Sequence, residues 1–85
     1  MASRYFIYGV LDCPFCVKAM RELDDRNCAY HFFDLEEDEA FMSDVKDFYK
    51  HSTVPIVLEN DIDTGATTFI GGCDSLLERL NDQRS

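Results

Sequence analysis

The sequence has few basic residues, with eight lysines and arginines against seventeen acidic residues and a formal net charge of −9 over 85 residues. It has no basic patch that alternates with aromatic residues, so nucleic-acid binding has no support. No apolar run approaches the roughly 20 residues that cross a bilayer, and we expect no membrane contact. Internal repeats, low-complexity tracts and linkers are also missing, so we expect a single domain over residues 1–85.

The start of the chain has no apolar core of a signal peptide, because residues 1–4 lead directly into an apolar segment. We therefore expect a cytoplasmic protein, in which paired cysteines are more often catalytic or metal-binding than structural. Seven phenylalanines, four tyrosines and a hydrophobic fraction of 46% suffice for a packed interior. The excess of acids disfavours anionic partners unless local basic groups compensate.

Two of the four cysteines form the motif Cys13-Pro14-Phe15-Cys16, between a strand-like run at 5–8 and a helical pattern. Pro14 suits the first position of a helix, which makes Cys13 its N-cap. The unpartnered N–H groups and the dipole at that helix end favour the thiolate of Cys13. Cys16 follows one turn later on the same side. The motif therefore predicts a disulfide that opens and closes.

The remaining pattern predicts an α/β fold of βαβ followed by ββα. A parallel unit with a right-handed crossover and an antiparallel hairpin together form a four-stranded mixed sheet flanked by three helices. We expect the mostly apolar second strand to be covered on both faces, and the aromatic stripe of the second helix (Phe41, Phe48 and Tyr49) to face the core. The predicted elements are strand 4–9, helix 14–26, strand 29–34, helix 38–50, strand 55–59, strand 67–70 and helix 74–82.

Two further motifs precede the third strand and the last helix. Thr53-Val54-Pro55 ends in a proline that cannot donate to a strand ladder and that often marks a cis peptide bond. Gly71-Gly72-Cys73-Asp74 combines a glycine pair with a helix start, where free N–H groups favour a carboxylate ligand. In α/β sheets, ligands bind at loops that follow the carboxyl ends of strands, and Cys13 lies on such a loop.

In this order, the three motifs resemble those of a glutaredoxin of the dithiol, CPFC type, along nearly the whole chain. The resemblance implies one glutaredoxin domain with a thioredoxin-like fold. It implies a glutathione-dependent thiol–disulfide oxidoreductase that reduces protein disulfides and glutathione mixed disulfides. Glutathione would be the co-substrate and no metal is expected. Its partners would be disulfide-containing proteins, with ribonucleotide reductase as one candidate, and the protein would act as a monomer.

The resemblance also assigns roles to residues. Cys13 would be the nucleophile and Cys16 the resolving thiol, and the two would form the redox disulfide. Pro55 would be the cis-proline, and Asp74 would accept a hydrogen bond from the γ-glutamyl ammonium group. Phe15 replaces a tyrosine common in the family and keeps its aromatic face. The glutathione contacts implied in this way are Phe15, Thr53, Val54, Pro55, Gly72, Cys73 and Asp74.

The chain departs from the family near the nucleophile. Val10 stands three residues before Cys13, where many relatives carry a lysine or arginine. Asp12 adjoins Cys13, and its carboxylate should raise the pKa of the thiol, although by less than a helix N-terminus lowers it. Lys50 and His51 are the nearest basic residues that could hold the glycine carboxylate of glutathione.

Other functions remain open alternatives. Four cysteines could bind zinc or an iron–sulfur cluster, but only one CxxC is present, and we interpret Cys28 and Cys73 as packed apolar side chains. Three other functions are also alternatives: binding of a glutathione-assisted iron–sulfur cluster between two chains, thioredoxin-like electron donation to ribonucleotide reductase, and non-catalytic binding. The absence of tryptophan and the Gly72-Cys73-Asp74 segment favour glutathione over a thioredoxin-like role.

Overall fold

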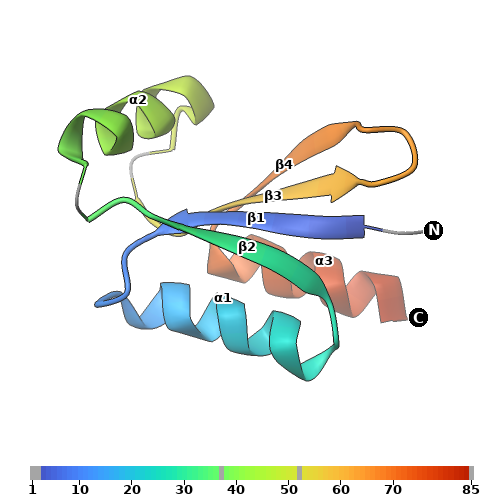
Figure 1. The fold of residues 1–85 in the computed structure, drawn as a ribbon. Helices are drawn as coiled ribbons and strands as arrows, with labels where there is room; N and C mark the ends of the chain where they lie inside the picture. Colours follow the sequence, from blue (N-terminus) through green and yellow to red (C-terminus); the bar gives the residue numbers. More distant parts are fainter. Residues whose placement is uncertain (1–2, 37, 52, 85) are drawn as a thin grey trace.

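A computed structural model describes residues 3–36, 38–51 and 53–84 (Figure 1). All seven predicted elements are present in the predicted order, and their bounds differ from the prediction by at most two residues. None of the described helices is long and apolar enough to cross a bilayer. The elements are β1 (Ser3–Gly9), α1 (Pro14–Asp25), β2 (Ala29–Asp34), α2 (Glu39–Tyr49), β3 (Ile56–Asp61), β4 (Thr67–Gly71) and α3 (Cys73–Arg84).

The four strands form one mixed sheet in the order β2-β1-β3-β4. β1 pairs with β2 in parallel, and the β1–β3 and β3–β4 pairs are antiparallel. The parallel pair is joined by α1, as a crossover connection requires. The predicted four-stranded mixed sheet is therefore confirmed.

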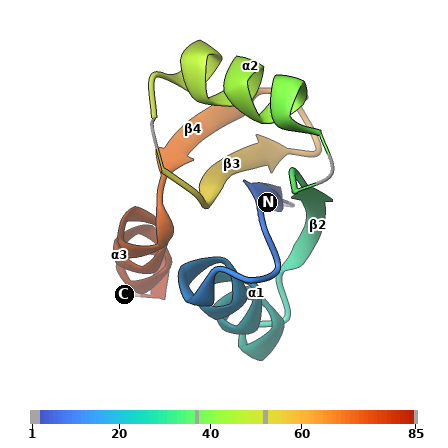
Figure 2. The ribbon, with the colours of Figure 1, turned by 90° about the vertical axis from the view of Figure 1, so that its left-hand side faces the viewer.

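α1 and α3 pack on one face of the sheet, while α2 lies over the other (Figures 1 and 2). The buried residues of α1 are Cys16, Ala19 and Leu23, and Leu23 is fully inaccessible to solvent. Burial of a side chain of this size contributes about 1.5–3 kcal/mol to folding. The core between the sheet and these two helices consists of Tyr5, Ile7, Ala19, Leu23, Val57, Cys73, Leu76 and Leu80.

The prediction that the second strand is covered on both faces is wrong. β2 lies at the edge of the sheet, and each of its six residues is at least partly exposed. Its aromatic residues pack along the sheet instead, with the Phe33 ring stacked on the Tyr8 ring at a centroid distance of 4.7 Å. An apolar run in the sequence indicates a strand, but it does not show whether that strand lies in the centre or at the edge of the sheet.

The prediction that the aromatic stripe of α2 belongs to the core is also wrong. Val45 is the buried residue of this helix, whereas Phe41 is 42% exposed and Phe48 is 77% exposed. α2 lies over the end of the sheet where β1 finishes (Figure 1). The apolar stripe is therefore wider than the surface that the sheet offers it.

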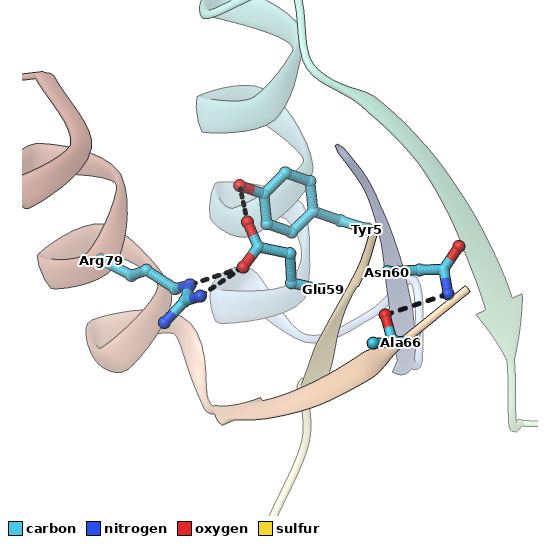
Figure 3. Close-up of polar contacts among 5 residues, drawn as sticks. All are labelled: Tyr5, Glu59, Asn60, Ala66 and Arg79. Atoms are coloured by element: carbon cyan, nitrogen blue, oxygen red, sulfur yellow. Dashed lines mark hydrogen bonds and ion pairs between the residues drawn. The ribbon is translucent and has the colours of Figure 1, made fainter. Parts of the chain in front are cut away.

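Two polar side chains of β3 are buried and hydrogen-bonded (Figure 3). Glu59 accepts a hydrogen bond from the hydroxyl of Tyr5 at 3.1 Å and another from Nε of Arg79 at 2.8 Å. Nη2 of Arg79 also forms an ion pair with the Glu59 carboxylate. Asn60 donates to the carbonyl oxygen of Ala66 at 3.4 Å, across the β3–β4 turn. These contacts tie β3 to β1, to α3 and to its own hairpin.

Candidate active site

Cys13 is the N-cap of α1, and Pro14 is the first helical residue, as predicted. Its backbone is extended (φ −88°, ψ 119°), so the side chain stands at the open end of the helix. Cys13 is partly exposed, whereas Cys16 is fully buried one turn later. The Cys13 Sγ atom lies 3.9 Å from the carbonyl oxygen of Val54. The accessible thiol of the pair therefore faces the segment before Pro55.

The surroundings of Cys13 favour its thiolate. Burial is the largest single influence on the Cys13 thiol and raises its pKa, but several hydrogen bonds together outweigh burial. The backbone N–H and the thiol of Cys16, together with the backbone N–H of Phe15, lower the pKa of Cys13 below its usual value. These donors lie in the first turn of α1, where N–H groups have no partner within the helix. Asp12, expected to raise this pKa, is not among the groups with the largest influence.

Cys16 has the opposite character. Burial raises the pKa of its thiol to about 12, and although a hydrogen bond from the backbone of Val10 opposes this, the hydrogen bond with Cys13 reinforces it. Cys16 is therefore protonated at neutral pH and can donate its S–H to the neighbouring sulfur. All four cysteines are free thiols in this structure, which therefore represents the reduced state. The two thiols of the motif differ in charge and in access.

Gly9 supplies the space that Cys16 occupies. A Cβ atom at this last position of β1 would lie 2.5 Å from Sγ of Cys16 and 3.4 Å from the ring of Phe32. Real Cβ atoms essentially never approach another heavy atom as closely as the first of these distances. The glycine is therefore needed here for close approach of the sulfur to the strand.

We expect Gly9→Ala to lower the free energy of unfolding by about 1–3 kcal/mol, because the added methyl group overpacks the buried sulfur. Urea unfolding of the reduced protein measures the change. Gly72→Ala is the matched control, since its Cβ would meet nothing closer than 3.7 Å, and its effect should stay within about 0.5 kcal/mol. Equal unfolding midpoints for the two variants would show that Cys16 has room to move.

A cavity of about 300 Å³ brings the predicted glutathione-contact residues together. Three separate segments form its walls: the first turn of α1, the segment before β3, and the start of α3. The Val54–Pro55 peptide bond is cis, which confirms that prediction. The cavity is lined by Phe15, His51, Thr53, Val54, Pro55, Gly72, Cys73, Asp74 and Ser75. All seven sequence-predicted contact residues are among them.

The residues of this cavity differ in access. Phe15 is 58% exposed and presents an apolar wall, and Asp74 is exposed in the first turn of α3. Cys73 is buried within the core cluster, and burial raises the pKa of its thiol although Lys18 opposes this. These properties are those of a packed, protonated thiol, in agreement with the interpretation made from the sequence.

Lys50 and His51, the two basic residues that could hold the glycine carboxylate of glutathione, differ in their position relative to the cavity. His51 lines the cavity, and its Nδ1 donates to the carbonyl oxygen of Thr53 at 2.7 Å. Its Nε2 lies 3.8 Å from the point where a Cβ of Gly72 would stand. Lys50 ends α2 in the left-handed conformation (φ 52°) and lines an adjoining hollow instead. His51 therefore connects the hollow beside α2 with the cavity beside Cys13.

Ser75 lines the cavity but was not found by sequence reasoning. It is the third residue of α3, and only the motif that ends one residue earlier signals its position. No group of three or more histidine, cysteine, aspartate or glutamate residues in the described ranges is arranged to hold a metal ion.

Comparisons with known proteins identify the family of this chain. The family model for glutaredoxins matches residues 5–61. Glutaredoxin 1 of Rickettsia felis is 32% identical over 83 residues, which cover 92% of this chain and 72% of that protein.

Solved glutaredoxin structures share the fold. A buckwheat glutaredoxin–glutathione complex superposes with a TM-score of 0.77 at 24% identity, covering 95% of this chain and 71% of that one. A dithiolic glutaredoxin from Trypanosoma brucei brucei superposes with a TM-score of 0.69 at 28% identity, covering 95% and 79%. The predicted thioredoxin-like fold is thus confirmed. The chain belongs to the glutaredoxin family and is a thiol–disulfide oxidoreductase.

Proposed function

We propose that the chain uses glutathione to reduce protein disulfides and glutathione mixed disulfides through Cys13 and Cys16. The observation that carries this proposal is the position of Cys13, whose thiolate is favoured and whose sulfur lies 3.9 Å from a carbonyl oxygen in the wall of the 300 Å³ cavity. Thiolates are the nucleophiles of disulfide exchange, so a reactive sulfur beside a cavity suits a small thiol co-substrate.

The chemistry of the cavity walls suits the three parts of glutathione. The backbone of Val54, beside the Cys13 sulfur, would pair with the cysteinyl part. The start of α3 offers free N–H groups to the γ-glutamyl carboxylate, and Asp74 offers a carboxylate to its ammonium group. His51 stands where the glycine carboxylate would end. The buckwheat glutaredoxin of the same fold forms a complex with glutathione, which supports glutathione as the ligand here.

Reduction of a glutathione mixed disulfide then needs two exchanges. The Cys13 thiolate attacks the glutathione sulfur, forms a new S–S bond with it, and releases the substrate thiolate, which takes up a proton. A second glutathione thiolate attacks the same sulfur, forms oxidised glutathione, and releases the Cys13 thiolate. The net reaction converts one glutathione mixed disulfide and one glutathione thiol into the substrate thiol and oxidised glutathione.

A protein disulfide can take a different second step. Once Cys13 is in a mixed disulfide, its sulfur is neutral and no longer raises the pKa of Cys16. Burial still favours the protonated thiol, so Cys16 attacks Sγ of Cys13 while its proton passes to the departing substrate sulfur, which leaves as a thiol. The resulting Cys13–Cys16 disulfide is reduced by two glutathione molecules.

The decisive experiment is glutathione-coupled reduction of a small glutathione mixed disulfide, followed as NADPH consumption with glutathione reductase. We expect turnover that depends on glutathione concentration. Turnover with a flavoprotein thioredoxin reductase alone would overturn the proposal in favour of a thioredoxin-like donor. Bound iron and colour after anaerobic purification would instead favour the cluster-binding alternative.

Asp74→Asn is expected to raise the KM for the glutathione-containing substrate about threefold to tenfold, because a charged hydrogen-bond acceptor for the γ-glutamyl ammonium becomes neutral. The value of kcat should change little, since Asp74 does not contact the reacting sulfur. Steady-state kinetics measure both constants. Asp63→Asn, an exposed carboxylate on the β3–β4 turn, is the control. An equal KM in the two variants would remove Asp74 from the glutathione site.

We further propose that the protein acts as a monomer in the cytoplasm on disulfide-containing proteins, with ribonucleotide reductase as one candidate. A paired CxxC in a compartment that keeps thiols reduced supports a catalytic rather than a structural disulfide. Restoration of nucleotide reduction by the purified reductase, in the presence of this protein and glutathione, tests that acceptor.

A further inference from the structure

The aromatic residues of α2 that do not enter the core line a separate hollow, which we call the α2 aromatic pocket. Its volume is about 250 Å³, and it shares no residue with the cavity beside Cys13. Phe48 is the most exposed apolar residue of this pocket, and Phe41 is also exposed. Grouped, exposed apolar side chains of this size mark interaction sites. The pocket is lined by Tyr8, Phe41, Asp44, Val45, Phe48 and Tyr49.

The rings of this pocket present their faces in different directions. The Tyr8 and Phe41 centroids lie 6.0 Å apart with the ring planes at 67°, and Phe48 and Tyr49 lie 4.8 Å apart at 77°. Each pair is therefore close to perpendicular. Aromatic faces carry negative partial charge and attract cations. One face of Tyr8 is stacked on Phe33, and one face of Tyr49 is stacked on Phe69. The exposed rings of Phe41 and Phe48 are therefore the ones best placed for such a contact.

The charges of the pocket point to the same kind of ligand. Asp44 is exposed at its wall, and the lining includes no lysine, arginine or histidine. No hydrogen bond or ion pair within the described ranges engages the Asp44 carboxylate. Burial, and then neighbouring Tyr49, raise the pKa of Tyr8, so its phenol stays neutral at physiological pH. A cation here therefore meets the Asp44 carboxylate and the exposed rings of Phe41 and Phe48.

We propose that the α2 aromatic pocket binds a lysine or arginine side chain in a segment of a partner protein. The exposed apolar surface of Phe41 and Phe48 around the pocket suits apolar residues on either side of that basic residue. A second copy of this chain fits poorly, because each copy carries a net charge of −9. The pocket is lined by residues of α2 and by Tyr8 of β1. α2 lies over the end of the sheet where β1 finishes (Figure 1). This binding does not depend on the proposed use of glutathione.

The test is an NMR titration of the reduced protein with two capped, cysteine-free pentapeptides that differ at one atom. One contains arginine between leucines, and the other contains citrulline, the neutral isostere of arginine. We expect saturable shifts of the Tyr8, Asp44 and Phe48 amide signals with the arginine peptide, and about tenfold weaker binding of the citrulline peptide. Equal binding of both peptides, or no saturable shift with the arginine peptide, would overturn the proposal.

Paired variants locate the site. Phe48→Ala and Asp44→Asn should each weaken binding of the arginine peptide about threefold to tenfold. Ile62→Ala and Asp63→Asn change an exposed apolar residue and an exposed carboxylate on the β3–β4 turn, and should leave binding of the arginine peptide unchanged. Undiminished binding by both pocket variants would overturn the proposal. Shifts of the same signals that grow with protein concentration alone would also overturn it, by assigning this surface to self-association.

Discussion

Cys13→Ser is expected to abolish reduction of a glutathione mixed disulfide, leaving only the rate measured without protein. A serine hydroxyl cannot form the S–S bond of the mixed-disulfide intermediate, and its oxygen remains protonated at neutral pH. Loss of activity should not reflect loss of structure, because Cys13 is partly exposed and serine is among the preferred N-cap residues of helices. Glutathione-coupled NADPH consumption measures the rate, and urea unfolding verifies the fold.

Cys16→Ser separates the two thiols and serves as the control. It should keep activity on glutathione mixed disulfides, which a second glutathione can resolve, and should lose most activity on protein disulfides that need Cys16. Full activity of Cys13→Ser together with inactivity of Cys16→Ser would reverse the assigned roles.

The pH dependence of alkylation by iodoacetamide gives the same assignment without turnover. The pKa of Cys13 is lowered by hydrogen bonds to its sulfur, so its rate should rise with pH through a midpoint below that of an ordinary cysteine. Cys16 contributes nothing in this range, because its pKa is raised to about 12. The low-pH rise should vanish in Cys13→Ser. A rise that begins only above the usual cysteine pKa would show that the helix start does not stabilise this thiolate.

The features of the site that depend only on residues adjacent in the sequence could be predicted from the sequence. Proline at the first helical position, with Cys13 before it, determines an N-cap by short-range geometry alone. The TVP and GGCD motifs each combine backbone-restricting residues with an element boundary, so their conformations follow from a few adjacent positions. The strand order then brings the three segments to one cavity, because the crossover of β1 and β2 and the β3–β4 hairpin leave few topologies.

Features that depend on what covers a surface could not be predicted. The period of α2 indicates an apolar face, but not that Phe48 on this face is 77% exposed. The composition of β2 is that of a buried strand, although the strand is an edge. Both errors arise because periodicity describes one element and burial depends on its neighbours. Ser75 was missed for the same reason, because its place in the cavity depends on the position of α3 relative to β3.

The polar cluster of Figure 3 could not be predicted either, because its residues lie far apart in the sequence. Its disruption should have the second large effect that we expect, on the free energy of unfolding. Glu59 lies 20 residues from Arg79 and 54 from Tyr5, so no local pattern connects them. In the folded chain the Glu59 side chain is 11% exposed, and the Arg79 side chain, 40% exposed, covers it from α3. A carboxylate removed from water to this degree depends on charged or hydrogen-bonded neighbours.

We expect Arg79→Leu to lower the free energy of unfolding by about 2–4 kcal/mol at neutral pH, less than for a fully buried pair because Arg79 is partly exposed. The hydroxyl of Tyr5 still donates to Glu59, since burial and the carboxylate itself raise the pKa of Tyr5 and keep its proton in place. Urea unfolding of Arg79→Leu, with Arg79→Lys as the charge-retaining control, measures the loss.

The double variant Glu59→Leu, Arg79→Leu decides whether the loss comes from the buried charge or from the packing of the arginine stem. If the charge is responsible, removing the carboxylate as well should restore part of the stability. The deficit of Arg79→Leu should also shrink as pH falls. A buried carboxylate that has lost a cationic neighbour has a raised pKa in the folded state, and the stability it contributes when protonated is lost as pH rises. A deficit that is independent of pH and persists in the double variant would show that Arg79 stabilises the sheet by packing alone.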